Sequence, residues 1–394
     1  MNRIFLKRGK EESLARRHPW IFSGAIERIE GDPEEGDVVD VYARSGEFLA
    51  RGHYQIGSIT VRVLLFEQEE IDAAWWEARL RAAWAVRRAI GLIDSPDTDC
   101  YRLVHGEGDN LPGLVIDIYG DVAVVQAHSV GMYRSRQAIC EALRTVYGDR
   151  LAAVYDKSAQ TLPYKAETGA VDGYLYGGGA STERIVTEHG NRFHVDWGVG
   201  QKTGFFLDQR ENRALVGHYS AGRTVLNTFS YTGGFSVYAL AGGAREVVSV
   251  DSSATAVALA VRNAELNFGP DVHHEGVASD VFDYLKTTDK QFDLIILDPP
   301  AFAKHHKVLG NATKGYTRLN ARALSQIAPG GILFTFSCSQ AVSRELFRTT
   351  VFTAAAIAGR RVRILHQLTQ PADHPVNIYH PEGEYLKGLV LYVE

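Results

Sequence analysis

The sequence predicts an α/β protein in which a doubly wound, Rossmann-like sheet follows two smaller N-terminal domains. Its 394 residues, 45% of them hydrophobic, can bury two or three separate cores. The first 70 or so residues hold short apolar runs between turn residues, whereas strands alternate with helices after Arg223. That alternation is typical of a parallel sheet covered by helices on both faces. We expect domains at residues 1–72, 73–190 and 191–394.

The N-terminal domain is predicted to be a small β-barrel-like module. Three strands are expected, at VVDVYA, FLARGHY and ITVRVLLF. The stretches GDPEEGD and RSGE are rich in turn-forming residues and are expected to lie in turns between strands. A charged helix is expected next, over residues 72–91. Its apolar side chains recur near helical spacing at Trp76, Leu80, Trp84 and Ile90.

The middle domain is predicted to be α+β. GLVIDIYGDVAVVQAHS has the pattern of a hairpin that turns at residues 119–121, and a helix is expected over 132–147. The glycine-rich stretch GYLYGGGA is predicted to be an exposed loop.

The C-terminal domain carries the clearest strand and helix pattern. Strands are expected at VLNTFS, EVVSVD, FDLIILD, GGILFTFS, VRILHQL and LVLYV, with helices near 234–242, 253–267, 313–328 and 341–357. In open sheets of this kind, ligands bind beyond the C-terminal ends of the strands. The residues at those ends are therefore the first candidates for a functional site.

Composition narrows the class of protein. The three cysteines, Cys100, Cys140 and Cys338, are far apart and form no C-x-x-C pair, which argues against a zinc site or a disulfide framework. We therefore expect no metal and a reducing, cytoplasmic location. No apolar run reaches membrane-spanning length, and MNRIFLKRGK has no apolar signal core.

Any binding to nucleic acid must come from local basic patches, because the net charge is −5. Two such patches each carry a charge of +4. Residues 1–20 place six bases against Glu11 and Glu12, and residues 301–320 hold four bases, two histidines and no acid. The predicted RNA contacts are Lys7, Arg8, Arg16, Arg17, Lys304, Lys307, Lys314 and Arg318. A solvated surface explains either patch equally well.

Three strand ends predict a pocket for an adenosine-bearing cofactor. NTFSYTGGFSVYAL places Gly233 and Gly234 between a strand and a helix, where a ligand can approach the backbone, although the G-x-G-x-x-G fingerprint is absent. Asp251 follows about 20 residues later, where an acid can bind both ribose hydroxyls or simply cap a helix. Asp280 stands at the third strand end, near the expected adenine.

The fourth strand end separates the cofactor classes. FDLIILDPPAF holds Asp298 before two prolines, which leave a rigid loop with few backbone donors. A nicotinamide enzyme has no evident use for this acid. A sulfonium cofactor with an amino-acid tail, or a nucleobase with ring and amino N–H groups, would find an acceptor there.

These motifs resemble those of class I S-adenosylmethionine-dependent methyltransferases. More narrowly, the chain resembles the bacterial family that makes 5-methylcytosine in large-subunit (23S) ribosomal RNA. The resemblance rests on RRHPWIFSGAI, similar to an N-terminal PUA-type RNA-binding module, and on GEGDNLPGLVIDIYGD, GQKTGFFLDQRENR, LDPPAFAK and the SCS of FTFSCSQ. It covers nearly the whole chain, and GQKTGFFLDQR is its most specific segment.

The resemblance implies a role for each matching residue. The cofactor would be held by Thr203, Arg210, Phe229, Tyr231, Gly233, Asp251, Asp280 and Asp298. Asp298 would also orient the target cytosine, and Cys338 would be the catalytic nucleophile. Many RNA 5-methylcytosine enzymes carry a second cysteine next to the proline of this motif, but Pro300 stands there, so the group that removes the C5 proton is left open.

The chemistry explains why a thiol is expected. C5 of cytosine is a poor nucleophile, and addition of a thiolate to C6 turns C5 into an enamine carbon that can attack a methyl group. A helix starting near Ser339 or Ser343 would favour the thiolate of Cys338. Cys140 reads as core packing, because it follows Ile139 in a helix.

The expected partner is ribosomal RNA that is protein-free or in early assembly, because the target base must leave its stack. A homodimer is left open. The alternatives are an exocyclic-amine or guanine N7 methyltransferase that needs no thiol, and a non-catalytic RNA-binding protein with an adenosine pocket. A nicotinamide dehydrogenase is disfavoured by the absent fingerprint.

Overall fold

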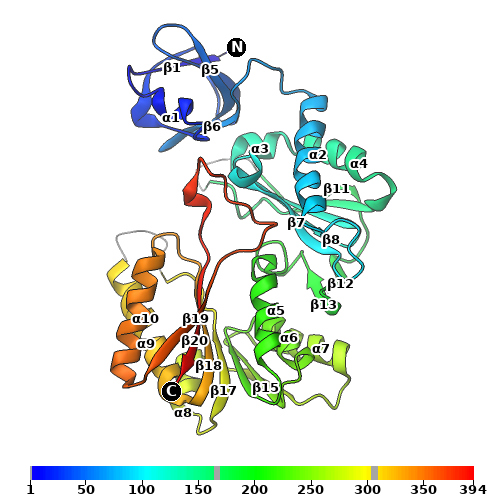
Figure 1. Cartoon of the computed structure of the whole chain (residues 1–394). Helices are drawn as coiled ribbons and strands as arrows, with labels where there is room; N and C mark the ends of the chain where they lie inside the picture. The colour runs from blue at the N-terminus through cyan, green and yellow to red at the C-terminus, as the bar shows by residue number, and fades with distance from the viewer. Residues whose placement is uncertain (1, 164–168, 303–308) are drawn as a thin grey trace. The chain divides into compact units, whose positions relative to one another are not determined.

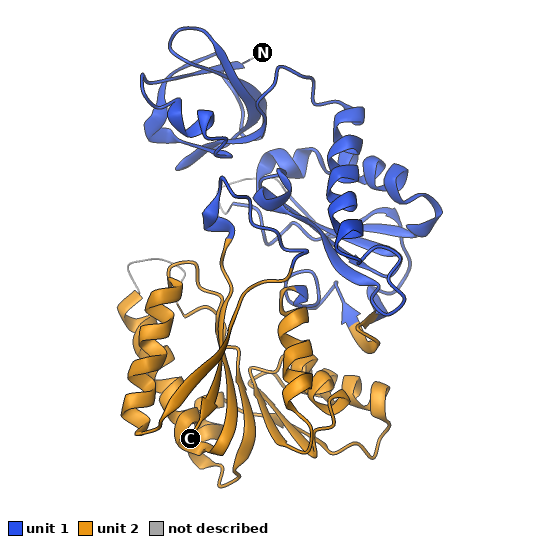
Figure 2. Ribbon diagram, viewed as in Figure 1, with its two compact units in different colours: residues 1–186, 195–207, 372–383 blue, residues 187–194, 208–371, 384–394 orange. Residues whose placement is uncertain are grey.

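The computed structural model describes residues 2–163, 169–302 and 309–394, which form two compact units (Figure 2). Unit 1 consists of residues 1–186, 195–207 and 372–383, and unit 2 of residues 187–194, 208–371 and 384–394. The chain order of helices and strands is shown in Figure 1. The division into three domains at residues 1–72, 73–190 and 191–394 stays a prediction.

Unit 1 begins with a six-stranded sheet in the order β2-β6-β5-β4-β1-β3. Its elements are β1 (Asn2–Leu6), α1 (Glu12–Ala15), β2 (Trp20–Phe22), β3 (Ile26–Glu30), β4 (Val38–Tyr42), β5 (Phe48–Tyr54) and β6 (Ile59–Leu65). Alternating apolar residues of these strands, among them Ile4, Val39 and Val61, are fully buried in one core. The predicted strands at β4, β5 and β6 are therefore present.

The second part of unit 1 is a five-stranded sheet in the order β11-β10-β9-β8-β7, with helices packed against it. Its elements are α2 (Ala73–Ala89), β7 (Cys100–His105), β8 (Leu114–Tyr119), β9 (Val122–Ala127), α3 (Val130–Arg134), α4 (Arg136–Tyr147), β10 (Ala153–Asp156) and β11 (Gly173–Gly177). The predicted hairpin is formed by β8 and β9, and Gly120 supplies the left-handed turn residue with φ 61°.

The prediction of an exposed loop at GYLYGGGA was wrong for its first five residues and is confirmed for residues 178–180. Residues Gly173–Gly177 form β11, which pairs antiparallel with β10. Tyr155 and Tyr174 face one another across this pair with their ring centroids 5.0 Å apart. Such aromatic cross-strand pairs stabilise a sheet, and this one outweighs the weak strand propensity of the glycines.

A two-residue turn joins β12 (Glu183–Glu188) to β13 (Asn191–Asp196). His189 and Gly190 have φ values of 47° and 77°, which is the pattern of a type I′ hairpin turn. The division between the two units runs through this hairpin.

Unit 2 is built on a seven-stranded sheet in the order β16-β15-β14-β17-β18-β20-β19. Its elements are α5 (Arg210–Tyr219), β14 (Thr224–Thr228), α6 (Gly234–Ala241), β15 (Glu246–Asp251), α7 (Ala254–Phe268), β16 (His274–Ala278), α8 (Val281–Thr287), β17 (Phe292–Leu297), α9 (Leu309–Gln326), β18 (Ile327–Ser337), α10 (Arg344–Ala358), β19 (Val362–Leu368) and β20 (Lys387–Val393). Only β20 runs antiparallel to its neighbours. The predicted doubly wound sheet is therefore present. Helices α5 and α8 were not predicted, and for β16 only a strand end near Asp280 was expected.

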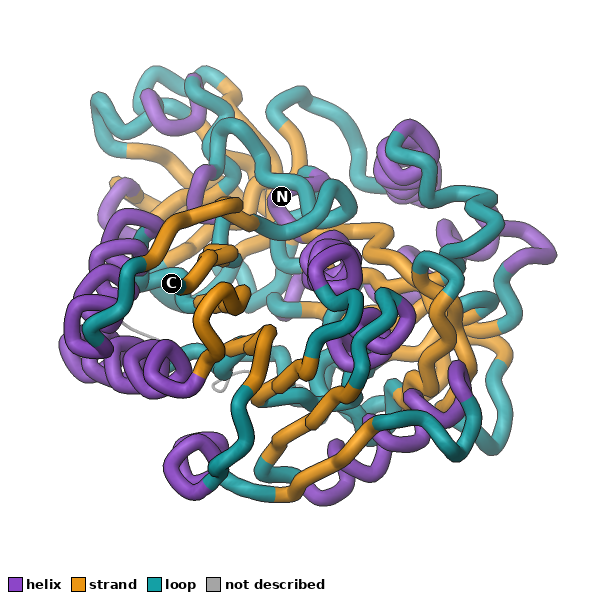
Figure 3. Tube along the Cα trace, turned by 60° about the horizontal axis from the view of Figure 1, so that its bottom comes forward, coloured by secondary structure: helices purple, strands orange, loops and turns teal. Residues whose placement is uncertain are grey.

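Side chains of successive residues in the central strands pack into two different hydrophobic cores, one on each face of the sheet. Ile295 and Leu297 of β17 pack with α8, α9 and α10, whereas Leu294 and Ile296 pack with α5 and α6. The helices of unit 2 thus flank its strands on both sides (Figure 3). A strand buried on both faces reads as a continuous apolar run, which is why FDLIIL was recognisable.

Candidate active site

The strand order of unit 2 reverses between β14 and β17. Thr228 pairs with Leu297, and Leu297 pairs with Thr335 of β18, so the C-terminal ends of these three parallel strands lie side by side. Asp298 and Cys338 follow two of those ends directly. The predicted pocket region and its two predicted catalytic residues therefore share one edge of the sheet, at the position where doubly wound folds bind ligands.

The turn after β14 has a strained backbone. Phe229 and Tyr231 have φ values of 52° and 44°, which non-glycine side chains adopt rarely and mainly at functional sites. Gly233, with φ 77°, packs so closely on α7 that an added Cβ would lie 2.8 Å from Cβ of Ala260. This close packing leaves the turn without side-chain bulk at Gly233.

Asp251 fixes that turn. Its carboxylate accepts hydrogen bonds from the backbone N–H groups of Tyr231 and Ser253, both at 2.9 Å. A carboxylate oxygen can accept more than one hydrogen bond, so both oxygens can still receive a hydroxyl. Asp251 does not cap helix α7, because the side chain of Ser253 does so. The arrangement fits a ribose-bearing cofactor.

Asp280 is exposed and caps helix α8. Its Oδ1 accepts the backbone N–H groups of Phe282 at 2.8 Å and Asp283 at 3.1 Å. A contact with adenine stays a prediction.

Asp298 is a half-buried acid whose carboxyl has a pKa near neutrality. Burial raises the pKa of its carboxyl to about 7, and the nearby carboxylate of Asp208 adds to the rise. A hydrogen bond of 3.0 Å from the Gln209 side-chain amide and the charge of Arg213 act in the opposite direction. At pH 7 a large fraction of Asp298 is therefore protonated and can donate a hydrogen bond.

Cys338 lies between β18 and α10 and is partly exposed. Burial, with the charges of Asp298 and Asp208, raises the pKa of its thiol to about 11, and the charge of Lys387 acts in the opposite direction. Helix α10 begins at Arg344 with Ser343 as its cap. The helix start predicted near Ser343 is therefore confirmed, whereas activation of Cys338 by this helix stays a prediction.

Lys387 is a buried base that sequence reasoning missed. It lies opposite Ser337 in the β18–β20 pair, and its Nζ donates a 2.7 Å hydrogen bond to the carbonyl of Ser339. Burial lowers the pKa of its ammonium group to about 8, and Cys338 acts against that shift. A lysine that interrupts the apolar segment LKGLVLYV was the available signal.

Comparisons with known proteins identify the family. Residues 101–378 match the family described as S-adenosylmethionine-dependent methyltransferase, and residues 4–66 match a PUA-like domain. The chain is 44% identical over 394 residues to the ribosomal RNA large subunit methyltransferase I of Aeromonas salmonicida, and the match covers 98% of each chain. The chain belongs to this family of S-adenosylmethionine-dependent methyltransferases.

Two solved structures resemble the whole methyltransferase. A putative SAM-dependent methyltransferase from Streptococcus mutans has a TM-score of 0.85 at 26% identity, over 100% of both chains. A putative methyltransferase complexed with SAH has a TM-score of 0.86 at 26% identity, also over 100% of both chains. The predicted family, fold class, PUA-type domain and S-adenosylmethionine cofactor are thereby confirmed.

Two predicted cofactor residues of the methyltransferase lie in buried polar networks. In unit 2, Arg210 lies 3.4 Å from the fully buried Glu188, which also binds Arg213 at 2.8 Å. In unit 1, the hydroxyl of Thr203 donates to Asp117 at 2.5 Å and lies 2.9 Å from that of Tyr119. Direct contact of either residue with the cofactor stays a prediction.

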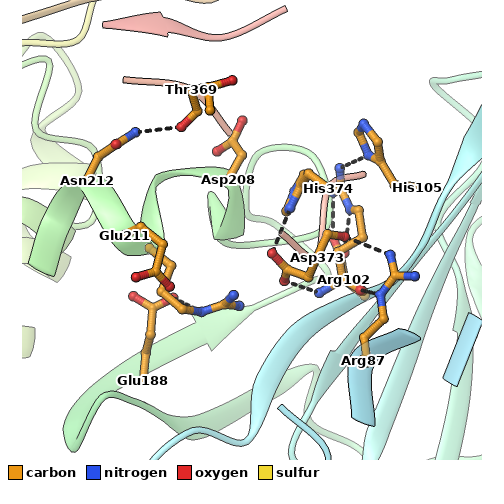
Figure 4. Close-up of polar contacts among 12 residues, drawn as sticks. Arg87, Arg102, His105, Glu188, Asp208, Glu211, Asn212, Thr369, Asp373 and His374 are labelled. Atoms are coloured by element: carbon orange, nitrogen blue, oxygen red, sulfur yellow. Dashed lines mark hydrogen bonds and ion pairs between the residues drawn. The ribbon is translucent and has the colours of Figure 1, made fainter. Parts of the chain in front are cut away.

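Another buried polar network connects residues 372–383 of the methyltransferase to the rest of unit 1. The carboxylate of Asp373 accepts the backbone N–H of Arg102 at 3.0 Å, and its carbonyl accepts from Arg87 at 2.7 Å (Figure 4). Burial, together with His374 and Arg102, lowers the pKa of His105 well below its usual value. This neutral histidine avoids a further buried charge beside the two arginines.

The predicted RNA contacts are distributed over both units. Lys7, Arg8, Arg16 and Arg17 are exposed on the N-terminal domain, and Lys314 and Arg318 are exposed on α9. Lys304 and Lys307 lie outside the described residues. Tyr316, which could have stacked on bases, is fully buried and packs against Phe302 with centroids 4.7 Å apart.

The other two thiols of the methyltransferase are not part of this site. Cys140 is fully buried, and burial raises the pKa of its thiol to about 11, so the prediction of core packing is confirmed. Cys100 is also fully buried, in β7. Cys338 is thus the one partly exposed thiol of the chain.

In the described part of the chain, one group of side chains has the composition of a metal site. His18, His380 and Glu382 in unit 1 place their ligand atoms within 4.8 Å of one another. The ring of His380 packs edge-on against Trp20 with the ring centroids 4.3 Å apart. No described helix is both long and apolar enough to cross a membrane.

Proposed function

We propose that this methyltransferase transfers a methyl group to C5 of a cytosine in 23S ribosomal RNA through a covalent bond between Cys338 and C6. The observation that carries the proposal is the adjacency of two strand ends, one followed by Asp298 and the other by the partly exposed Cys338. The name of the relative from Aeromonas salmonicida supports ribosomal RNA as the substrate.

The strained turn and its acid would hold the cofactor. Asp251 would accept the ribose hydroxyls, and the backbone near Gly233 would lie against the cofactor because no side chain stands there. When bound, S-adenosylmethionine supplies an electrophilic methyl group on a positively charged sulfur.

Cys338 would attack as the thiolate. With a pKa of about 11, the fraction ionised at pH 7.5 is only about 1 in 3,000, so the thiol must be activated when substrate binds. Lys387 assists, since its positive charge lowers the pKa of this thiol. Attack at C6 forms the carbon–sulfur bond and pushes electron density toward C5 and N3 of the cytosine.

Asp298 would stabilise that electron density. Its proton, held to a pKa of about 7, can be donated to N3 of the cytosine as negative charge develops there. An acid with an ordinary pKa would be ionised at pH 7 and would repel the same charge. A half-buried aspartate beside the nucleophile can therefore act as this acid.

The substrate base would have to leave its stack to reach the pocket. The exposed basic residues at the N-terminus and on α9 would bind phosphates without reading sequence. We also propose a cytoplasmic location and a homodimer, and size-exclusion chromatography with light scattering tests the latter.

The proposal is tested by mapping methylated cytosines in 23S ribosomal RNA by bisulfite sequencing. A strain that lacks the protein should lose one modified position, the wild-type gene should restore it, and Cys338→Ala should not. Binding of SAH to purified Cys338→Ala, measured by calorimetry, controls for folding. Methylation retained by this variant would instead favour transfer to a nitrogen, which needs no thiol.

A further inference from the structure

Asp208 is an acidic residue of unit 2 that has no role in the proposed methyl transfer. It follows Leu207 in a short 3₁₀ turn, Leu207–Gln209. The hydroxyl of Tyr385 donates a 2.7 Å hydrogen bond to Oδ2. The other oxygen, Oδ1, is buried and has no hydrogen-bond partner among the described residues. A buried carboxylate oxygen in that state calls for a ligand.

The surroundings of Asp208 place it at the reacting groups. Tyr385, which donates to Asp208, stands two residues before Lys387, and Nζ of Lys387 donates a 2.7 Å hydrogen bond to the carbonyl of Ser339, the residue after Cys338. The charge of Asp208 also raises the pKa of both Asp298 and Cys338. The next residue, Gln209, donates its side-chain amide to Asp298 at 3.0 Å. These hydrogen bonds connect the chain segments that carry Asp208, Asp298 and Cys338.

We propose that Asp208 is the base that removes the C5 proton of the methylated cytosine. This inference rests on the covalent mechanism proposed above. Once C5 carries both the methyl group and its hydrogen, Oδ1 of Asp208 takes the proton. The C5–H electron pair then forms the C5–C6 double bond, the C6–S bond breaks, and the thiolate of Cys338 leaves. N3 returns its proton to Asp298, and Asp208 loses the C5 proton to water.

The neighbouring groups are less suited to this step. Asp298 holds its own proton near neutral pH, and that proton serves N3. Nζ of Lys387 is bonded to the carbonyl of Ser339. Pro300 has no group that exchanges a proton. Two carboxyl groups in different environments can divide the roles of acid and base between them.

The test uses Asp208→Asn and two labels. Methyl transfer is followed with methyl-labelled S-adenosylmethionine, and proton removal is followed by tritium release from RNA that carries [5-³H]cytosine. We expect Asp208→Asn to transfer up to one methyl group per enzyme and then to stop as an RNA–protein adduct that survives denaturation. Tritium release should fall about 100-fold or more, which is a usual contribution of a general base.

Two further variants separate this role from a structural one. Tyr385→Phe keeps the carboxylate but removes its 2.7 Å hydrogen bond, so tritium release should fall by less than in Asp208→Asn. Asp208→Glu should restore part of the release. The idea is overturned if Asp208→Asn releases tritium normally, or if methyl transfer and tritium release fall together without an adduct. If Asp208→Asn does not fold, Tyr385→Phe is measured in its place. A parallel loss of methyl transfer and tritium release in Tyr385→Phe, without an adduct, would likewise overturn the proposal.

Failure of the covalent mechanism itself has a different signature. Wild-type enzyme incubated with RNA that carries 5-fluorocytosine should be trapped as an adduct, because no base can remove fluorine as a cation. Without adduct in the wild type, the proposed bond to Cys338 is wrong, whatever Asp208 does.

Discussion

The side-chain amide of Gln209 donates a 3.0 Å hydrogen bond to Asp298 and lowers the pKa that burial raises. Replacing Gln209 with Leu removes this opposing contribution. We therefore expect the pKa of Asp298 to rise above about 7 and the alkaline limb of the kcat profile to move to higher pH. Methyl transfer measured from pH 6 to pH 9 checks the direction of the shift. An unchanged limb would mean that Asp298 is not the acid.

Asp298→Asn should stabilise the fold at high pH while it abolishes activity. The folded-state pKa of about 7 lies above the usual 3.8, so the native state keeps a proton that the unfolded chain has lost. Stability from this group is therefore lost as pH rises from about 4 to 7, by as much as about 4 kcal/mol. Thermal unfolding should show Asp298→Asn equal to wild type at pH 4 and more stable at pH 8.

Lys387→Met should make Cys338 a weaker nucleophile. Removing the ammonium group raises the pKa of the thiol, so alkylation of Cys338 by iodoacetamide should slow several-fold at pH 7.5. The difference from wild type should shrink above pH 8, where Lys387 itself becomes neutral. Lys387→Arg keeps the charge and is the matched control. Peptide mass spectrometry reports the modification of Cys338 separately from the buried thiols.

Gly233→Ala should damage both folding and cofactor binding. Its φ of 77° disfavours a side chain, and the new Cβ would lie 2.8 Å from that of Ala260, so we expect a loss of about 2–4 kcal/mol. Gly222→Ala is the control, since Gly222 has φ 71° but nothing within 4 Å, and should cost only about 1 kcal/mol. Thermal unfolding with and without SAH measures both effects.

Substitution of the exposed bases should weaken RNA binding in a salt-dependent manner. Lys314→Ala and Arg318→Ala should each reduce the slope of log affinity against log salt by about 1 if each side chain binds a phosphate. Arg144 is a suitable control, because its charge is matched by Glu141 at 2.8 Å. Slopes are measured by filter binding with a 23S ribosomal RNA fragment, and equal slopes in all variants would exclude α9 as a contact.

The sequence was most informative where strands end. Asp251, Asp298 and Cys338 each follow an apolar run, and parallel strands bring their C-terminal ends to one edge whatever lies between them. The hairpin at Gly120 was equally readable, because its signal lies in neighbouring residues.

The residues that were missed depend on partners far away in the chain. Asp208 accepts a hydrogen bond from Tyr385, and Lys387 donates one to the carbonyl of Ser339. Both contacts exist only in the folded protein. The strand His274–Ala278 lies at the edge of the sheet and is only partly buried, so it lacks the apolar run that marked the central strands.

The path of the chain between β19 and β20 limits how the protein can be divided. Residues 372–383 belong to unit 1, although the strands before and after them belong to unit 2. A single proteolytic cut therefore cannot release the catalytic sheet intact, and a gene fragment ending after β19 would lack the strand that carries Lys387. Any attempt to express unit 2 alone must bridge this excursion with a designed linker from residue 371 to residue 384.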